Sequence, residues 1–217
     1  NDALDILENL KHRGGTGADE NTGDGAGILI QIPHNFFNKV CKESNVSLPK
    51  SGEYAIGVLF LPTEKKKKEL ALNIMNKVLM QKGYNTLLLR DVPVDYSGLG
   101  KAALESMPNI IQIILDKPNN IKDTREFERE LYILRRNIEK AFNLEESLNN
   151  CTTYIASLSS KTIVYKGMLL STQVREFYPD LLDKDVESAI ALVHSRYSTN
   201  TFPSWERAHP NRMMVHN

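Results

Sequence analysis

Large apolar residues recur along the chain at the spacings of amphipathic helices and of half-buried strands. The clearest helix is predicted over residues 123–142, where apolar side chains return every three or four positions. These positions are Phe127, Leu131, Leu134, Ile138 and Phe142. Asp123 and Glu126 stand where a capping pair would begin this helix. The pattern therefore predicts a long helix with one buried face.

Shorter patterns divide the rest of the chain into further helices and strands. Helices are predicted over 3–13, with Ala3, Ile6, Leu7 and Leu10 inward, and over 34–41 and 64–82. Strands are predicted over 27–32, 54–61, 84–92, 109–115, 152–158, 162–166, 190–197 and 212–216. The short SSK link between 152–158 and 162–166 favours a hairpin. This order fits a layered sandwich with much antiparallel sheet better than a strict βαβ alternation, although the order alone leaves both open.

Composition and charge narrow the class of protein. The 217 residues indicate one large domain, and 27 basic residues balance 27 acidic ones, so no general attraction to nucleic acid or anionic membrane is expected. Cys41 and Cys151 lie far apart, which argues against a disulfide framework or structural zinc site and favours a reducing compartment. No apolar run is long enough for a membrane span and no signal peptide is recognised. We therefore expect a soluble cytoplasmic protein.

Three local features each have a plain structural interpretation. The glycine-rich segment 22–27 lacks the ending of a phosphate-binding loop and precedes a strand, so a tight turn is favoured. The lysine run 65–68 opens an amphipathic helix and is interpreted as a solvated face. Cys41 and Cys151 have no histidine nearby in sequence, and buried free cysteines are more common than nucleophiles.

The segment 194–217 combines more chemistry than any other. It runs HSRYSTNTFPSW and later MMVHN. Arg196, at the end of a predicted strand, could grip a carboxylate bidentately, and the hydroxyls and amide that follow could hold a small polar substrate. Asn217 carries an amide of the kind that stabilises oxyanions. The alternative is that Arg196 forms an ordinary ion pair and Asn217 is a turn residue.

These motifs resemble the glutaminase domain of the glutamate synthase large subunit. Earlier segments agree in the same order: LKHRGGTGADENTGDGAGILIQIPHNFF, ELYILRRNIEKAF and YIASLSSKTIVYKGMLLSTQVREFYPDLLD. The TGDGAG and KGMLL…FYPDLL segments separate this family from other class II amidotransferases, which share only the HRG, HSR-like and HN(G) elements. The resemblance covers nearly the whole chain.

The resemblance implies an α+β fold, a four-layer αββα sandwich of the N-terminal-nucleophile hydrolase type with two mainly antiparallel sheets. An N-terminal cysteine would attack the glutamine side-chain amide and form a glutamyl thioester, releasing ammonia. Arg196 would bind the α-carboxylate of L-glutamine, and Tyr197, Thr199 and Asn200 would line the same pocket. Asn217 would complete the oxyanion hole, with Arg13 in a supporting place near the nucleophile.

The chain departs from the family pattern at both ends. The first residue is Asn1, where the family has an N-terminal cysteine as nucleophile. The last residue is Asn217, which the family pattern follows with a glycine. We therefore expect residues 1–217 to be a fragment of the amidotransferase domain, lacking the cysteine strand and the part after His-Asn, and inactive alone. Two alternatives remain: a glutamine-binding or scaffold module without its nucleophile, and a glutaminase attached to another synthase.

The resemblance also implies a larger parent enzyme. Ammonia would pass to downstream synthase domains of the same polypeptide, where 2-oxoglutarate is aminated and reduced with FMN and an iron–sulfur cluster. Electrons would come from a small NAD(P)H-oxidising subunit or from ferredoxin. We expect no cofactor or metal in residues 1–217 themselves.

Overall fold

The computed structural model describes residues 2–15, 19–198 and 200–213, except for the side chain of Arg13. The chain divides into two compact units. The first unit comprises residues 1–33, 93–107 and 164–217, and the second comprises 34–92 and 108–163. Each unit contains one sheet, so the chain leaves the first unit and returns to it twice.

The second unit is built on a four-stranded sheet in the order β3-β4-β2-β5. Its strands are β2 (Tyr54–Leu61), β3 (Thr86–Asp91), β4 (Asn109–Asp116) and β5 (Tyr154–Ser159). β2 pairs antiparallel with both β4 and β5, and β3 pairs antiparallel with β4. All eight residues of β2 are buried, which explains its uninterrupted apolar sequence.

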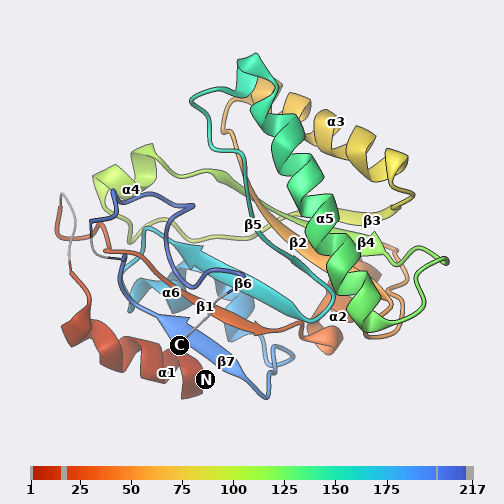
Figure 1. Ribbon diagram of the computed structural model, residues 1–217. Helices are drawn as coiled ribbons and strands as arrows, with labels where there is room; N and C mark the ends of the chain where they lie inside the picture. The colour runs from red at the N-terminus through yellow and green to blue at the C-terminus, as the bar shows by residue number, and fades with distance from the viewer. Residues whose placement is uncertain (1, 16–18, 199, 214–217) are drawn as a thin grey trace. The chain divides into compact units, whose positions relative to one another are not determined.

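The described residues of the second unit also form four helical elements. They are α2 (His34–Glu43), α3 (Lys65–Gln81), α5 (Thr124–Asn143) and the 3-10 turn η2 (Glu146–Leu148). α3 and α5 lie side by side, and the apolar face of α5 joins residues of β2 and β4 in one hydrophobic core (Figure 1). Asp123 caps α5 by accepting a hydrogen bond from the Glu126 backbone at 2.8 Å. The predicted helix, its inward face and its cap are confirmed.

The first unit is built on a three-stranded sheet in the order β6-β1-β7. Its strands are β1 (Ala26–Gln31), β6 (Thr162–Gly167), whose first two residues belong to the second unit, and β7 (Ala191–His194). Its helical elements are α1 (Asp2–Asn9), η1 (Leu10–Arg13), α4 (Lys101–Glu105), α6 (Gln173–Phe177) and η3 (Pro179–Leu182). β1 and β7 run antiparallel, with Gly27 opposite His194. Gly27 permits close packing, since a Cβ there would lie 2.5 Å from the Tyr165 carbonyl oxygen.

The predicted hairpin between 152–158 and 162–166 is wrong. β5 belongs to the sheet of β2, whereas β6 belongs to the sheet of β1. The intervening turn is bound to α5, because the Glu128 carboxylate accepts hydrogen bonds from the Ser160 backbone at 2.6 Å and the Ser159 hydroxyl at 2.9 Å. These bonds fix the turn as a crossing point from one sheet to the other.

Other local predictions were also wrong in detail. The first helix buries Leu4 and Leu7, while Ile6 is 55% exposed, and its last turn is a 3-10 helix. α4 was not predicted because five residues are too few to show a helical period. The strand predicted over 190–197 is confined to β7, and the one over 212–216 falls largely outside the described residues.

Both sheets carry helices, and the pairings β1–β7, β2–β4, β2–β5 and β3–β4 are all antiparallel. The α+β class with two mainly antiparallel sheets is therefore confirmed. The predicted single-domain organisation and four-layer stacking depend on how the two units associate. Both therefore stay predictions. Among the described residues, no helix combines the length and apolar character needed to cross a membrane.

We predict that Leu134→Ala destabilises the second unit by about 2–5 kcal/mol, because it leaves a cavity in the core beneath α5. Ile133→Ala is the matched control: Ile133 is the preceding, exposed residue, and its truncation should cost less than about 0.5 kcal/mol. Amide hydrogen exchange of peptides from α3 and α5 measures both effects locally. Equal protection in the two variants would contradict the assignment of this core.

Candidate functional site

The end of β7 presents Arg196 beside Asp24. The strand ends at His194, and the side chain of Arg196 is 69% exposed two residues later. Its Nε atom lies 3.7 Å from Oδ2 of Asp24, whose side chain is only 27% exposed. Burial raises the pKa of Asp24, and the charge of Arg196 acts in the opposite direction. The pair thus joins a partly buried carboxylate to a solvent-facing guanidinium.

The turn after η1 lies against this pair, and Gly14 permits its close approach to β7. A Cβ at Gly14 would lie 3.2 Å from the carbonyl oxygen of Ser195, and one at Gly15 would lie 3.5 Å from the Asp24 carboxylate. The Asp24 backbone also donates a hydrogen bond to the Gly15 carbonyl at 3.1 Å. The turn after η1 therefore holds both the end of β7 and Asp24 in place.

Tyr197 is a buried support of the site. Its hydroxyl donates a hydrogen bond to the Ser204 carbonyl at 2.8 Å, and burial raises its pKa. Gly25 has a φ of 77°, in the left-handed region, and a Cβ there would lie 2.9 Å from the Tyr197 ring. Glycine at this position thus satisfies both the turn and the packing of Tyr197, which confirms the tight-turn interpretation of 22–27.

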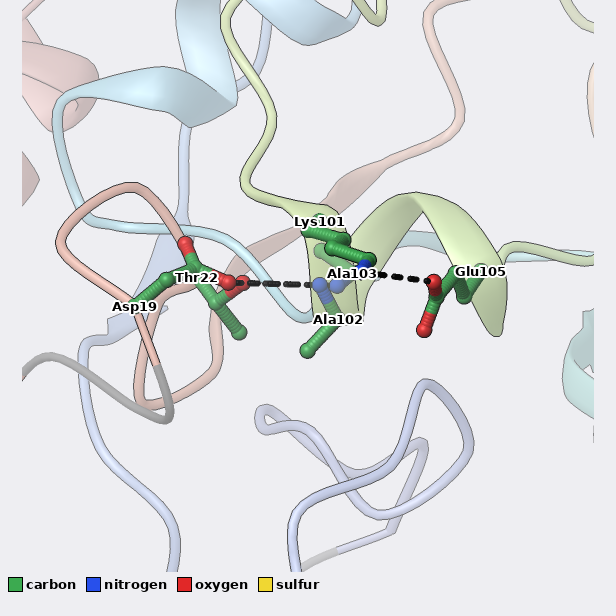
Figure 2. Close-up of polar contacts among 6 residues, drawn as sticks. All are labelled: Asp19, Thr22, Lys101, Ala102, Ala103 and Glu105. Carbon is green, nitrogen blue, oxygen red and sulfur yellow. Dashed lines mark hydrogen bonds and ion pairs between the residues drawn. The ribbon is translucent and has the colours of Figure 1, made fainter.

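The loop that carries Asp24 is fastened to α4 (Figure 2). The Asp19 carboxylate accepts a hydrogen bond from the Ala102 backbone at 3.2 Å. The Thr22 hydroxyl donates to Asp19 at 2.7 Å and accepts from the Ala103 backbone at 3.3 Å. These side chains satisfy backbone N–H groups that a helix start leaves without partners. They also fix the loop two residues before Asp24.

Two buried side chains extend this attachment. Gln173 donates hydrogen bonds to the carbonyls of Asn21 at 3.1 Å and Gly98 at 2.7 Å. The indole of Trp205, 1% exposed, donates to the Ala103 carbonyl at 3.1 Å. The loop, α4 and the segment around Trp205 therefore form one hydrogen-bonded block within the first unit.

A cluster of basic groups lies next to this block. The rings of His194 and His209 are 4.7 Å apart, and His209 Nε2 lies 3.2 Å from the Ser198 hydroxyl. Lys166 is fully buried, and its ammonium donates to the Glu206 carbonyl at 2.8 Å. Burial lowers the pKa of Lys166 from 10.5 to about 7. Burial, together with the charges of His194 and Lys166, also lowers the pKa of His209.

Comparison with known proteins gives this arrangement a family. The chain matches the model of the glutamine amidotransferases class-II over residues 1–217. It is 46% identical over 214 residues to the glutamate synthase [NADPH] large chain of Bacillus subtilis, covering 99% of this chain and 14% of the relative. It is 43% identical over 221 residues to the glutamate synthase [NADH] of Schizosaccharomyces pombe, covering 100% of this chain and 10% of the relative.

A plant protein is similar to the same extent. The ferredoxin-dependent glutamate synthase 1, chloroplastic/mitochondrial, of Arabidopsis thaliana is 41% identical over 216 residues, covering 100% of this chain and 13% of the relative. The chain belongs to the class-II glutamine amidotransferases. The predicted resemblance is confirmed, and the chain spans between 10% and 14% of the length of these relatives.

The structure of this amidotransferase chain places only some of the predicted site residues. It brings Arg196 and Tyr197 together with Asp24. Asn200 is exposed, with a φ of 62° that asparagine tolerates. Thr199 and Asn217 lie outside the described residues, and Arg13 is described only as the last backbone residue of η1.

The two cysteines lie in the second unit. Cys41 is fully buried in α2, and burial raises the pKa of its thiol. Cys151 accepts a hydrogen bond from the Lys67 ammonium at 3.3 Å. Within the described ranges, no group of three or more His, Cys, Asp or Glu side chains is arranged to hold a metal ion.

Sequence reasoning missed Asp19, Thr22, Gln173 and Lys166. None belongs to a short catalytic motif. Besides contacts with residues two or three positions away, their side chains form hydrogen bonds to residues 40 to 152 positions away along the chain. The sequence indicates Asp24 only as a residue of the predicted tight turn over 22–27. Its closeness to Arg196 depends on the pairing of β1 with β7, which no local pattern reveals.

We predict that the first unit becomes more stable as the pH rises from 7 towards 10. The folded pKa of Lys166 is about 7, below its ordinary value of 10.5, so in this range the unfolded chain binds a proton that the folded chain does not. The gain should reach at most about 1.4 kcal/mol per pH unit. Amide exchange of β1 and β6, corrected for its intrinsic pH dependence, measures it.

Lys166→Met should abolish this pH dependence, because it replaces the buried amine with an apolar side chain. Lys184→Met, at an exposed position of the first unit, is the control and should keep the wild-type slope. A slope that survives in the Lys166→Met protein would assign the titration to another group.

Proposed function

We propose that this chain is the glutamine-hydrolysing domain of a glutamate synthase. It converts L-glutamine to glutamate and ammonia, and the ammonia passes to downstream synthase domains of the same polypeptide for reductive synthesis of glutamate from 2-oxoglutarate. The family match along the whole chain supports the first step. The second is supported by relatives that are named glutamate synthases in a bacterium, a yeast and a plant.

The observation that carries the proposal is the exposed guanidinium of Arg196 at the end of β7. A planar guanidinium with several N–H donors matches the two oxygens of a carboxylate. Arg196 binds the α-carboxylate of glutamine, and Tyr197 supports the wall of this pocket from its buried position. Thr199 and Asn200 supply polar groups for the rest of the substrate.

The chemistry follows from a cysteine thiol at the mature N-terminus, which precedes Asn1 in the family pattern. The sulfur attacks the side-chain amide carbon of glutamine, and the α-amino group of the same cysteine takes the thiol proton. The carbon–nitrogen bond then breaks, ammonia leaves with that proton, and water hydrolyses the thioester to glutamate. Asn217 stabilises the oxyanion that forms in the attack, and Arg13 helps to shape the surroundings of the nucleophile.

We assign the cofactors of the parent enzyme to its remaining domains. Two cysteines are fewer than the four thiolates of a cluster held by cysteine alone, and we place the ligands of the cluster outside residues 1–217. FMN and the cluster are assigned to the synthase domains, with electrons from a small NAD(P)H-oxidising subunit or from ferredoxin. We also propose a cytoplasmic location, although the plant relative is named as chloroplastic/mitochondrial.

Labelling with a glutamine-analogue diazoketone tests the proposed function. The protein as its gene encodes it is treated with the reagent, and the adduct is mapped by peptide mass spectrometry. We expect one adduct on an N-terminal cysteine that precedes Asn1, and protection by excess glutamine. An adduct on Cys41 or Cys151 would overturn the mechanism. No adduct would favour a glutamine-binding or scaffold module instead.

We further predict that Asn217→Ala lowers the kcat of glutamine hydrolysis by about 10²–10³, because it removes one donor of the oxyanion hole. The KM for glutamine should change little, since the oxyanion exists only after attack. Steady-state assays of glutamate release measure both constants. An effect limited to KM would show that Asn217 contacts the bound substrate and not the oxyanion.

A further inference from the structure

Asp24 is the one acidic group that approaches Arg196 in the described part of the first unit, and the proposed chemistry gives it no task. The two side chains differ in how firmly they are placed. Asp24 is largely covered, and its carboxylate packs on Gly15, whereas Arg196 faces solvent. Asp24 thus places a largely covered negative charge beside an exposed guanidinium, and this charge favours one orientation of the guanidinium.

Contacts of the residues before and after Asp24 fix its position. Two residues before it, Thr22 is bonded to α4, and one residue after it, Gly25 lies under the ring of Tyr197. The Asp24 backbone is bonded to Gly15 between these points. These contacts set the place of the Asp24 carboxylate in the absence of substrate.

The contact engages one particular edge of the guanidinium. Oδ2 of Asp24 lies nearest to Nε of Arg196, on the side of the fork that joins the aliphatic stem. A guanidinium presents five N–H donors, and a carboxylate is best bound by two of them in parallel. At 3.7 Å this is an ion-pair contact and not a hydrogen bond, and it leaves the two terminal nitrogens to face a second carboxylate end-on.

We propose that Asp24 is a positioning residue for substrate: it orients Arg196 so that its terminal nitrogens receive the α-carboxylate of an amino acid. This inference rests on the proposed function of the site. Asp24 also places a negative charge near the incoming carboxylate, which opposes binding. Because Arg196 is exposed, water screens that repulsion, while the long arginine side chain loses much freedom when it binds. The benefit of orienting Arg196 therefore exceeds the repulsion between Asp24 and the incoming carboxylate.

Asp24→Asn in the protein as its gene encodes it tests the proposal. We expect the KM for glutamine to rise about three- to fivefold while kcat stays nearly unchanged, as for loss of an interaction present equally in ground and transition states. Asp24→Glu retains the charge and should recover part of the loss. Asp95→Asn is the matched control, because Asp95 is an exposed residue of the same unit whose carboxylate accepts a hydrogen bond from the Ser97 backbone at 2.9 Å. It should leave both constants unchanged.

A double variant separates an action through Arg196 from an independent one. Arg196→Lys alone should raise the KM for glutamine sharply, and adding Asp24→Asn to it should cause little further increase. Increases that multiply would mean that Asp24 acts without Arg196 and would overturn the proposal. A lower KM in Asp24→Asn would also overturn it, because repulsion would then dominate.

The same assays distinguish this inference from the proposed function. If Arg196→Lys raises KM but Asp24→Asn does not, Asp24 has no positioning role and the function stands. If Arg196→Lys leaves KM unchanged, the proposed substrate contact itself is wrong. Amide exchange of β1 and β7 verifies that each variant is folded, and Asp24→Ser replaces Asp24→Asn if the latter is not.

Discussion

The attachment of the glycine-rich loop to α4 is the constraint on which the site depends. Asp19 and Thr22 bind backbone N–H groups at the start of α4, and a Cβ at Gly100 would lie 1.9 Å from Asp19, so the two segments fit only with glycine there. The indole of Trp205, in the segment 164–217 of the first unit, donates a hydrogen bond to the Ala103 carbonyl of the same helix. Without this block, neither Asp24 nor Tyr197 would have a defined place beside Arg196.

The division of the chain into two units separates two physical tasks. The second unit holds the large apolar core of α3, α5 and the four-stranded sheet, where burial of hydrophobic surface provides stability. The first unit holds the polar contacts of the site and buries an amine, Lys166, at the expense of its charge. The segment 93–107 contributes α4 to the first unit although it lies between strands β3 and β4 of the second.

The sequence predicted what depends on local pattern and failed where distant segments decide. α5 and β2 were predicted nearly to the residue, because their apolar periods are long and their ends are marked by Asp123 and Pro62. The link at Ser160 resembles a hairpin, but a long-range bond to Glu128 makes it a crossing. Arg196 stood out by its motif, whereas Asp24 became its partner only through the pairing of β1 with β7.

A structure of the protein as its gene encodes it, determined with bound glutamine or glutamate, tests the central claim most directly. We expect the α-carboxylate of the ligand within about 3 Å of the terminal nitrogens of Arg196, as charge-assisted hydrogen bonds require. Asp24 should remain at the Nε edge of the same guanidinium. A ligand carboxylate bound elsewhere, with Arg196 directed only at Asp24 or at solvent, would contradict this account.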